Sequence, residues 1–277
     1  MKGGRVFVVL LRNEWFKARK RLAFWIPLGF YALVTFGTYA YPFLQESEGF
    51  RLPEVWTMVF GNEGVQFLIF SGLTVMLLAT PEFNWRTARQ NVIDGLSKSQ
   101  WFWGKSLLLP FVALAFLGTH ILIPGVLALI RTDLGAATEP LVPASVFAAT
   151  GGMVLAFLSV GALALFVAFA IRRTGASLAI WILWVGPIES GMLRALVMRY
   201  LPDYTDWLDY LPFGTAARLL DYRSYDTTIA EAMAAAAEAA GRPVPPAPDL
   251  TGHAIAAVAW AAFFLAASFI WFRRRDL

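Results

Sequence analysis

The run that decides the fold of this chain is "VFAATGGMVLAFLSVGALALFVAFAI", residues 146–171. It carries no charged side chain, and a helix of about 20 apolar residues already crosses a hydrocarbon core of about 30 Å. Comparable runs elsewhere complete a set of six expected spans: 23–43, 64–81, 106–130, 146–171, 176–197 and 253–272. Only 15% of the 277 residues are charged, against about 25% in soluble domains. The sequence predicts an all-α integral membrane protein with six transmembrane helices in a single transmembrane domain, residues 1–277.

Basic residues are concentrated at alternate ends of these spans. Residues 1–22, the second and fourth connections and the C-terminus hold most of the 23 lysines and arginines, whereas the first and third connections hold one each, Arg51 and Arg131. The positive-inside rule then places both termini in the cytoplasm and residues 198–252 outside. We therefore expect a multi-pass protein of a cytoplasmic membrane, with both termini inside.

Several kinds of chemistry are excluded by composition. The chain has no cysteine and only two histidines, His120 and His253, which are far apart in the sequence. Disulfides, thiolate metal sites and cysteine nucleophiles are therefore ruled out. We expect no catalytic residue, no metal and no cofactor on this chain, and no nucleic-acid partner.

The stretch "GLSKSQWFWGKS", residues 95–106, ends like a phosphate-binding loop. That loop needs a glycine five positions before Gly104, where this chain has Ser99. Bulky aromatic residues fill the interval, and they would block the close curl of backbone N–H groups around a phosphate. The stretch is not expected to bind ATP.

The N-terminal segment, residues 1–22, is expected to form a helix that lies on the membrane. An apolar stripe recurs at three- and four-residue spacing, and it comprises Phe7, Leu11, Trp15, Ala18 and Leu22. Arginines recur every seven residues beside it, at Arg5, Arg12 and Arg19. Such a pattern is typical of an interfacial helix on an anionic leaflet. The alternative is a positively charged anchor that only sets the topology.

The second connection, residues 82–105, is expected to form a helical elbow. Residues 83–94 contain neither Gly nor Pro and predict a short helix, which Gly95 would end in a left-handed cap. Ser97 and Gln100 form a capping box for the next helix. The aromatic residues 101–103 are expected at headgroup depth, with Lys105 extended toward water.

The segment 198–252 is expected to be external and helical. Thr228 and Glu231 are spaced as a capping box ahead of an Ala-rich helix over 229–240, which Gly241 would stop. Seven aromatic residues crowd the part before it, between 200 and 225. They are interpreted as an interfacial belt, with a substrate-contacting vestibule as the alternative.

Three stretches resemble the ABC-2 type exporter permeases, the transmembrane subunits of type-2 ABC exporters. They are "LLRNEWFKARKRLAFWIPL" at 10–28, "PEFNWRTARQNVIDGLSKSQWFWGKSLLL" at 81–109 and "FIWFRRRDL" at 269–277. The second stretch is the specific one, because it is similar to the cytoplasmic signature of that family. The order of spans, the basic N-terminal helix and the large segment before span six also resemble the family.

The resemblance implies a permease that pairs with a second permease subunit, identical or related, and with two copies of a separate ABC-type ATPase. ATP and Mg would then be held by the partner ATPase. The short helix of the second connection would be the coupling helix that enters a groove on the ATPase. The residues implied in coupling are Glu82, Arg86, Arg89, Gln90, Asn91, Asp94, Gly95, Lys98 and Lys105.

Two other classes of protein remain open. An ion- or proton-coupled secondary transporter could use Glu189, which follows Gly186 and Pro187 in the fifth span. Glu189 lies about 16 residues beyond Arg173, or about 24 Å along a helix, so it is expected near the outer interface. There a hinge or a structural pair with Arg194, one turn on, is the favoured interpretation. Together with His120, these two residues are the candidates for a pathway or gate.

An intramembrane protease is the less favoured alternative. Glu82 with Arg86 matches one element of one such family in part, and Phe116 with His120 matches another. The first of these elements lacks a glutamate, and the third, after His253, is absent. His120 is therefore expected to make a polar contact between helices.

Overall fold

The computed structural model describes residues 3–45, 52, 55–60, 64–84, 87–132, 140–241 and 249–275. These residues are helical, with no strand among them. Six helices are long and apolar enough to cross a membrane: Leu22–Tyr41, Gly64–Phe83, Lys98–Ile130, Ala144–Ile171, Thr174–Tyr200 and Leu250–Arg274. All six expected spans are confirmed, and together they make a multi-pass membrane protein.

The third span begins earlier than expected, because the helix that precedes it continues through Leu107 with helical backbone angles. In chain order the α-helices are α1 (Gly3–Lys20), α2 (Leu22–Gln45), α3 (Val55–Phe60), α4 (Gly64–Ala79), α5 (Pro81–Asn84), α6 (Thr87–Ile93), α7 (Lys98–Ser106), α8 (Leu108–Arg131), α9 (Ala144–Ile171), α10 (Thr174–Leu183), α11 (Arg194–Tyr200), α12 (Pro212–Leu220), α13 (Thr227–Ala239) and α14 (Leu250–Arg274). A π-helix, η2 (Trp184–Leu193), joins α10 to α11, and two short 3₁₀ helices, η3 (Pro202–Tyr210) and η4 (Tyr222–Ser224), flank α12.

Helix α9 forms the centre of the bundle and packs against α14, α4 and α12. It is rich in Ala, Gly and Ser, and small residues allow helices to approach closely in a membrane. A Cβ added at Gly152 would lie 2.7 Å from the carbonyl oxygen of Leu219, so this glycine lets α12 contact α9. In the same way, a side chain at Gly72 of α4 would overlap the ring of Trp181 from α10.

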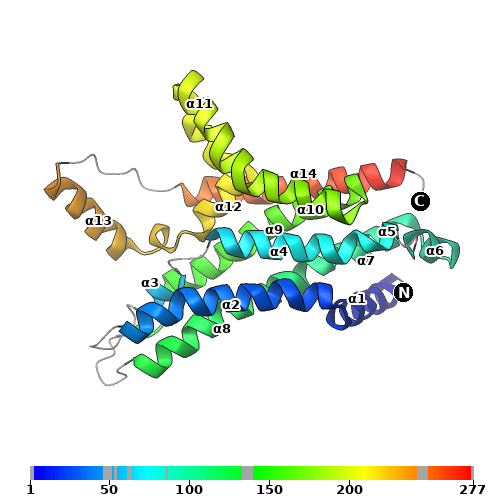
Figure 1. Cartoon of the computed structure of the whole chain (residues 1–277), viewed down its shortest axis with the longest axis horizontal. Helices are drawn as coiled ribbons and strands as arrows, with labels where there is room; N and C mark the ends of the chain where they lie inside the picture. Colours follow the sequence, from blue (N-terminus) through cyan, green and yellow to red (C-terminus); the bar gives the residue numbers. More distant parts are fainter. Residues whose placement is uncertain are drawn as a thin grey trace.

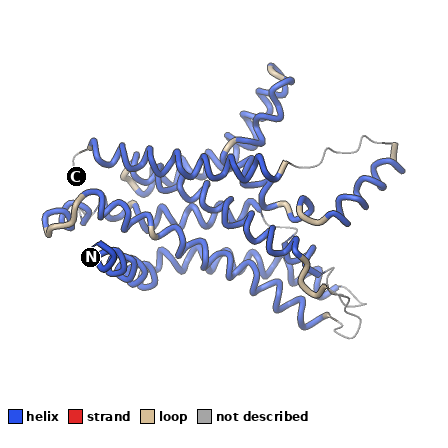
Figure 2. Tube along the Cα trace, turned by 180° about the vertical axis from the view of Figure 1, so that it is seen from behind, coloured by secondary structure: helices blue, strands red, loops and turns tan. Residues whose placement is uncertain are grey.

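The bundle has two distinct ends. Figure 1 shows α1, α5, α6 and the last turns of α14 at one end, which we call the terminal end, and α3 and α13 at the other. Figure 2 shows the same arrangement from behind. The fifth span leaves the bundle through η2, so that α11 projects away from the other helices (Figure 1). The basic ends of α1 and α14 therefore lie together.

The segment 198–252 contributes a helix that the sequence did not reveal. α12 is amphipathic and buries Phe213, Thr215, Ala216 and Leu219 against the bundle. Further on, α13 matches the expected Ala-rich helix, and Gly241 at its end has a φ of +62°. Its N-cap is Asp226, whose carboxylate accepts the Thr228 N–H, rather than Thr228 itself.

Candidate functional site

A buried ion cluster lies at the terminal end of the bundle. The Lys105 Nζ atom is 2.5 Å from Glu14 Oε2 and 2.7 Å from Glu82 Oε1. The side chains of Lys105 and Glu82 are each 1% exposed. The expectation that Lys105 extends toward water was wrong, because two carboxylates hold its ammonium inside the protein.

Two further cations surround the same carboxylates. Lys17 Nζ lies 3.0 Å from Glu14 Oε1 and 3.6 Å from Glu82 Oε1. Arg21 Nη2 lies 3.8 Å from Glu82 Oε1, and Arg21 Nη1 donates to the Leu78 carbonyl oxygen at 3.2 Å. The cluster therefore contains three cations and two carboxylates, and all of them contact at least one partner.

The titration of Lys17 follows from this arrangement. Burial alone lowers the pKa of the Lys17 ammonium, but the attraction of Glu82 and Glu14 outweighs it and raises the pKa above its ordinary value. A raised lysine pKa favours the charged, folded form. The contribution of Lys17 to stability is therefore complete at neutral pH and is lost only as the pH rises through the raised pKa.

Three separate elements supply the cluster. Glu14 comes from α1, Glu82 from α5 immediately after the second span, and Lys105 from the last turn of α7. Pro81 opens α5, where its missing N–H costs nothing at the first helical position. Thr80 bonds back to the Met76 carbonyl oxygen at 2.6 Å, which fixes the end of the preceding span. The cluster thus fastens the N-terminal helix, the second span and the start of the third span to one another.

An aromatic cluster lies beside the ion cluster and joins α7 to α9 and α14. Trp101 stacks on Phe272 with ring centroids 4.9 Å apart, and Phe102 lies 5.5 Å from Phe169. These four residues are buried, so Trp101 and Phe102 do not lie among lipid headgroups as expected. Only Trp103 of the three consecutive aromatics faces outward, with 47% of its surface exposed. The rings hold α7 rigidly against two long helices.

The elbow before α7 is formed largely as predicted. Gly95 has a φ of +107°, a backbone conformation that favours glycine. The Ser97–Gln100 capping box is confirmed, with Gln100 N donating to Ser97 Oγ at 3.1 Å and Ser97 N donating to Gln100 Oε1 at 2.9 Å. The helix predicted over 83–94 is instead two short helices, α5 and α6.

The remaining residues implied in coupling lie around this elbow. Gln90 donates to Asp94 at 2.9 Å, and Asn91 accepts the Leu96 N–H at 3.1 Å through its carbonyl oxygen. Arg89 is exposed on α6. Lys98 donates to the Arg275 carbonyl oxygen at 3.2 Å, which ties α7 to the end of α14. Arg86 lies outside the described residues.

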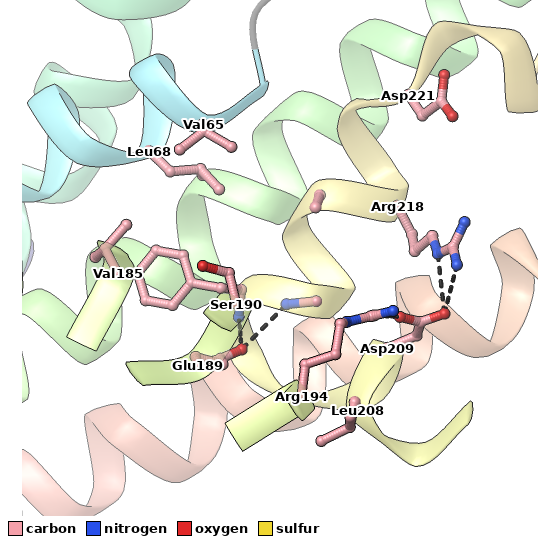
Figure 3. Close-up of a pocket in the computed structure, with 13 residues that line it drawn as sticks. Val65, Leu68, Val185, Glu189, Ser190, Arg194, Leu208, Asp209, Arg218 and Asp221 are labelled. Carbon is pink, nitrogen blue, oxygen red and sulfur yellow. Dashed lines mark hydrogen bonds and ion pairs between the residues drawn. The ribbon is translucent and has the colours of Figure 1, made fainter. Parts of the chain in front are cut away.

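Glu189 occupies a second polar site, in the π-helix of the fifth span. Its Oε1 atom accepts the backbone N–H groups of Phe213 at 2.7 Å and Gly214 at 3.1 Å, and its Oε2 atom accepts the Trp184 indole N–H at 2.7 Å. Phe213 and Gly214 lie in the first turn of α12, whose N–H groups have no partner within the helix. Glu189 therefore caps α12 from another part of the chain (Figure 3).

Arg194 does not pair with Glu189 as expected. It donates to Asp209 at 2.5 Å, and Arg218 binds the other oxygen of the same carboxylate (Figure 3). The backbone N–H groups already satisfy Glu189, whereas Asp209 is free to accept both guanidinium groups. These residues line a cavity of about 290 Å³ between α4, the fifth span and α12.

His120 makes the interhelical contact expected of it. Its Nδ1 atom lies 2.8 Å from the Tyr31 hydroxyl, which joins α8 to α2. Within the described part of the chain, no group of three His, Cys, Asp or Glu side chains could hold a metal ion.

Only some residues of the apolar stripe of the N-terminal segment pack together on the bundle. Ala18 is buried under the bundle, and Trp15 packs on Phe111 of α8 with centroids 5.2 Å apart. Leu11 lines a groove beside it, whereas Leu22 belongs to α2 and is 73% exposed. The Phe7 side chain lies outside the described part of the structure.

A scan against family models and a search of curated proteins both find no match for this chain. Three residues of the ion cluster, Glu14, Lys17 and Arg21, were not among the candidates from the sequence, and Glu14 is the acidic one. It is the only acidic residue in the first 45, and it lies on a helix of cations. A carboxylate does not strengthen the binding of a surface helix to an anionic leaflet. An isolated carboxylate in such a segment therefore indicates a specific partner.

Proposed function

We propose that this chain is the transmembrane permease subunit of a bacterial ABC-2 type exporter. The observation that carries the proposal is the ion cluster of Glu14, Glu82 and Lys105. The first two of the stretches that resemble the family are far apart in the sequence, yet acidic and basic residues from both meet in this one cluster. A shared buried network is what a device for transmitting movement between segments requires.

The geometry of the elbow supports a transmission role. α6 is short, exposed over much of its length and ends at the Gly95 turn. The capped helix that follows continues through Leu107 into the third span, which runs over Lys98–Ile130. Since the ion cluster and the aromatic rings hold α7 on three sides, a push on α6 would move the span rather than be absorbed in a loop.

In this proposal α6 is the coupling helix and docks in a groove of a separate ABC-type ATPase, which binds ATP and Mg. The terminal end faces the cytoplasm of the cell, in its inner membrane, because the basic residues gather there. α1 lies along the membrane interface, and α13 lies outside. Two permease subunits form the translocation pathway, and each binds one ATPase.

The first test reverses the charge of the coupling surface. Arg86→Glu with Arg89→Glu should reduce the affinity for the ATPase by about tenfold or more, because like charges would then face the partner's carboxylates. The permease is tagged and purified from its native membranes. The co-purified ABC-type ATPase is quantified by mass spectrometry and by its rate of ATP hydrolysis.

A matched control carries the same charge change elsewhere. Arg199→Glu with Arg223→Glu alters two exposed arginines, one in α11 and one in η4 between α12 and α13, and these elements lie away from the terminal end (Figure 1), so the ATPase should stay bound. If the double substitution retains the ATPase at the wild-type ratio, the segment around α6 is not where the ATPase docks. If no ABC-type ATPase co-purifies even with the wild-type chain, the proposed class is wrong.

The second test concerns Gly95. A β-branched residue at a φ of +107° is strained, so Gly95→Val should destabilise the elbow by about 1–3 kcal/mol. The chain should still insert and bind the ATPase, while hydrogen exchange of α6 and α7 amides rises and ATP hydrolysis no longer drives transport. Gly241→Val is the control, since Gly241 has a φ of +62° and equally open surroundings on the far side of the molecule. Equal hydrogen exchange and coupling in the two variants would contradict a special role for the elbow.

A further inference from the structure

A groove runs between α1 and α8 near the terminal end of the bundle, and its volume is about 640 Å³. Its walls are apolar, with a single charged side chain among the residues that line it. The lining consists of Val8, Leu11, Arg12, Trp15, Phe111, Leu114 and Ala115. In a membrane protein, an apolar groove of this kind is filled by a hydrocarbon chain or by another protein surface.

Among the cations of α1 whose side chains the structure describes, Arg12 is the one without a partner. Lys17 contacts Glu14, and the guanidinium of Arg19 and the ammonium of Lys20 lie 5.0 and 4.0 Å from the ring of Phe16. No ion pair or hydrogen bond is recorded for the exposed Arg12 side chain among the residues that the structure describes. An unpaired guanidinium at the edge of an apolar groove has the chemistry to bind a phosphate or carboxylate.

We propose that this groove binds one glycerophospholipid with a net negative headgroup. One acyl chain lies along Leu11, Trp15 and Phe111, and the lipid phosphate is bound by Arg12. A cation at the membrane surface attracts lipids with anionic headgroups. Trp15 lies where an aromatic side chain at the membrane interface is expected, one helical turn from Arg12.

The surroundings of Arg12 also explain selection against zwitterionic lipids. The ammonium of phosphatidylethanolamine needs a carboxylate close to the phosphate site. The acidic residue nearest in the sequence is Glu14, and Lys105 and Lys17 hold it inside the ion cluster. No carboxylate lines the groove, so a headgroup with a cation gains nothing there.

The test uses the full chain, purified in mild detergent and stripped of lipid. It is incubated with equal amounts of phosphatidylglycerol and phosphatidylethanolamine in mixed micelles, and the bound lipids are counted by native mass spectrometry. The wild-type chain should retain phosphatidylglycerol preferentially. Arg12→Gln should reduce that preference by about fivefold, the effect of one cation at a membrane surface. Arg12→Lys keeps the positive charge and should retain most of the preference for phosphatidylglycerol.

Two further variants separate the contributions of charge and shape. Ala115→Leu narrows the groove without changing charge and should lower the occupancy of both lipids. Arg19→Gln removes a cation of the same helix outside the groove and should leave the preference unchanged. Equal preference in the wild-type chain and Arg12→Gln would overturn the proposal. So would a chain that is dimeric without lipid and becomes monomeric with Ala115→Leu, since the groove would then be a contact between subunits.

Discussion

Lys105→Met should destabilise the protein by about 3–5 kcal/mol, the cost of removing one partner from a buried ion pair. The reason is the loss of the only fully buried cation of the cluster, which leaves Glu14 and Glu82 with the partly exposed Lys17 and Arg21. Methionine fills much of the same space, so the loss is electrostatic rather than a packing defect. The free energy of unfolding of the detergent-solubilised chain measures the effect.

A second substitution that removes a carboxylate tests whether the loss of stability comes from the unpaired charge or from altered packing. The double variant Glu82→Gln with Lys105→Met removes one carboxylate together with the lysine and leaves Glu14 paired with Lys17, so it should recover much of the lost stability. Lys98→Met removes a lysine from the other end of α7 and should cost about 1 kcal/mol or less, because Lys98 makes one exposed hydrogen bond and no ion pair with the described residues. If the Lys105→Met variant were as stable as the wild-type chain, the ion cluster would not be what holds these helices together.

Glu189→Leu should release the first turn of α12 from the bundle. Two backbone N–H groups and the Trp184 indole lose their acceptor, and the buried Phe213 N–H left without a partner costs about 1–3 kcal/mol by itself. Hydrogen exchange of the Phe213 and Gly214 amides should increase strongly, while amides of α9 remain protected. Ser190→Ala is the control, because the Ser190 hydroxyl bonds only within its own helix, to the Gly186 carbonyl oxygen.

Glu189→Gln separates a structural cap from an ion-binding role. The amide oxygen can still accept both backbone N–H groups, so α12 should stay protected and only the contact with Trp184 should weaken. A secondary transporter, in contrast, needs the charge of the carboxylate and would lose ion-coupled transport completely. Loss of amide protection equal to that of Glu189→Leu would contradict the capping role.

The parts of this fold whose contacts join residues close together in the sequence could be predicted from the sequence. The six spans follow from long apolar runs, and the elbow follows from Gly95, Ser97 and Gln100, whose contacts span only a few residues. The order of the helices was therefore predictable, and so was the gathering of the basic segments at one end of the bundle.

Contacts between distant residues could not be predicted in this way. Lys105 was assigned to the surface because lysines near span ends usually reach water, and nothing local indicates Glu14, 91 positions earlier. α12 was missed because Pro212 and Gly214 are typical of turns, and its cap comes from Glu189, about two dozen residues away. Hydrophobic periodicity cannot indicate which helix supplies the missing acceptor.

The ion cluster also determines when α1 can become fixed during synthesis of the chain. Glu14 and Glu82 leave the ribosome 91 and 23 residues ahead of Lys105. Until α7 has emerged, neither carboxylate can be enclosed, so α1 cannot settle into its final place while the first two spans are already in the membrane. The N-terminal helix, although made first, is therefore among the later elements to become fixed, and it can act as a check that the third span has inserted.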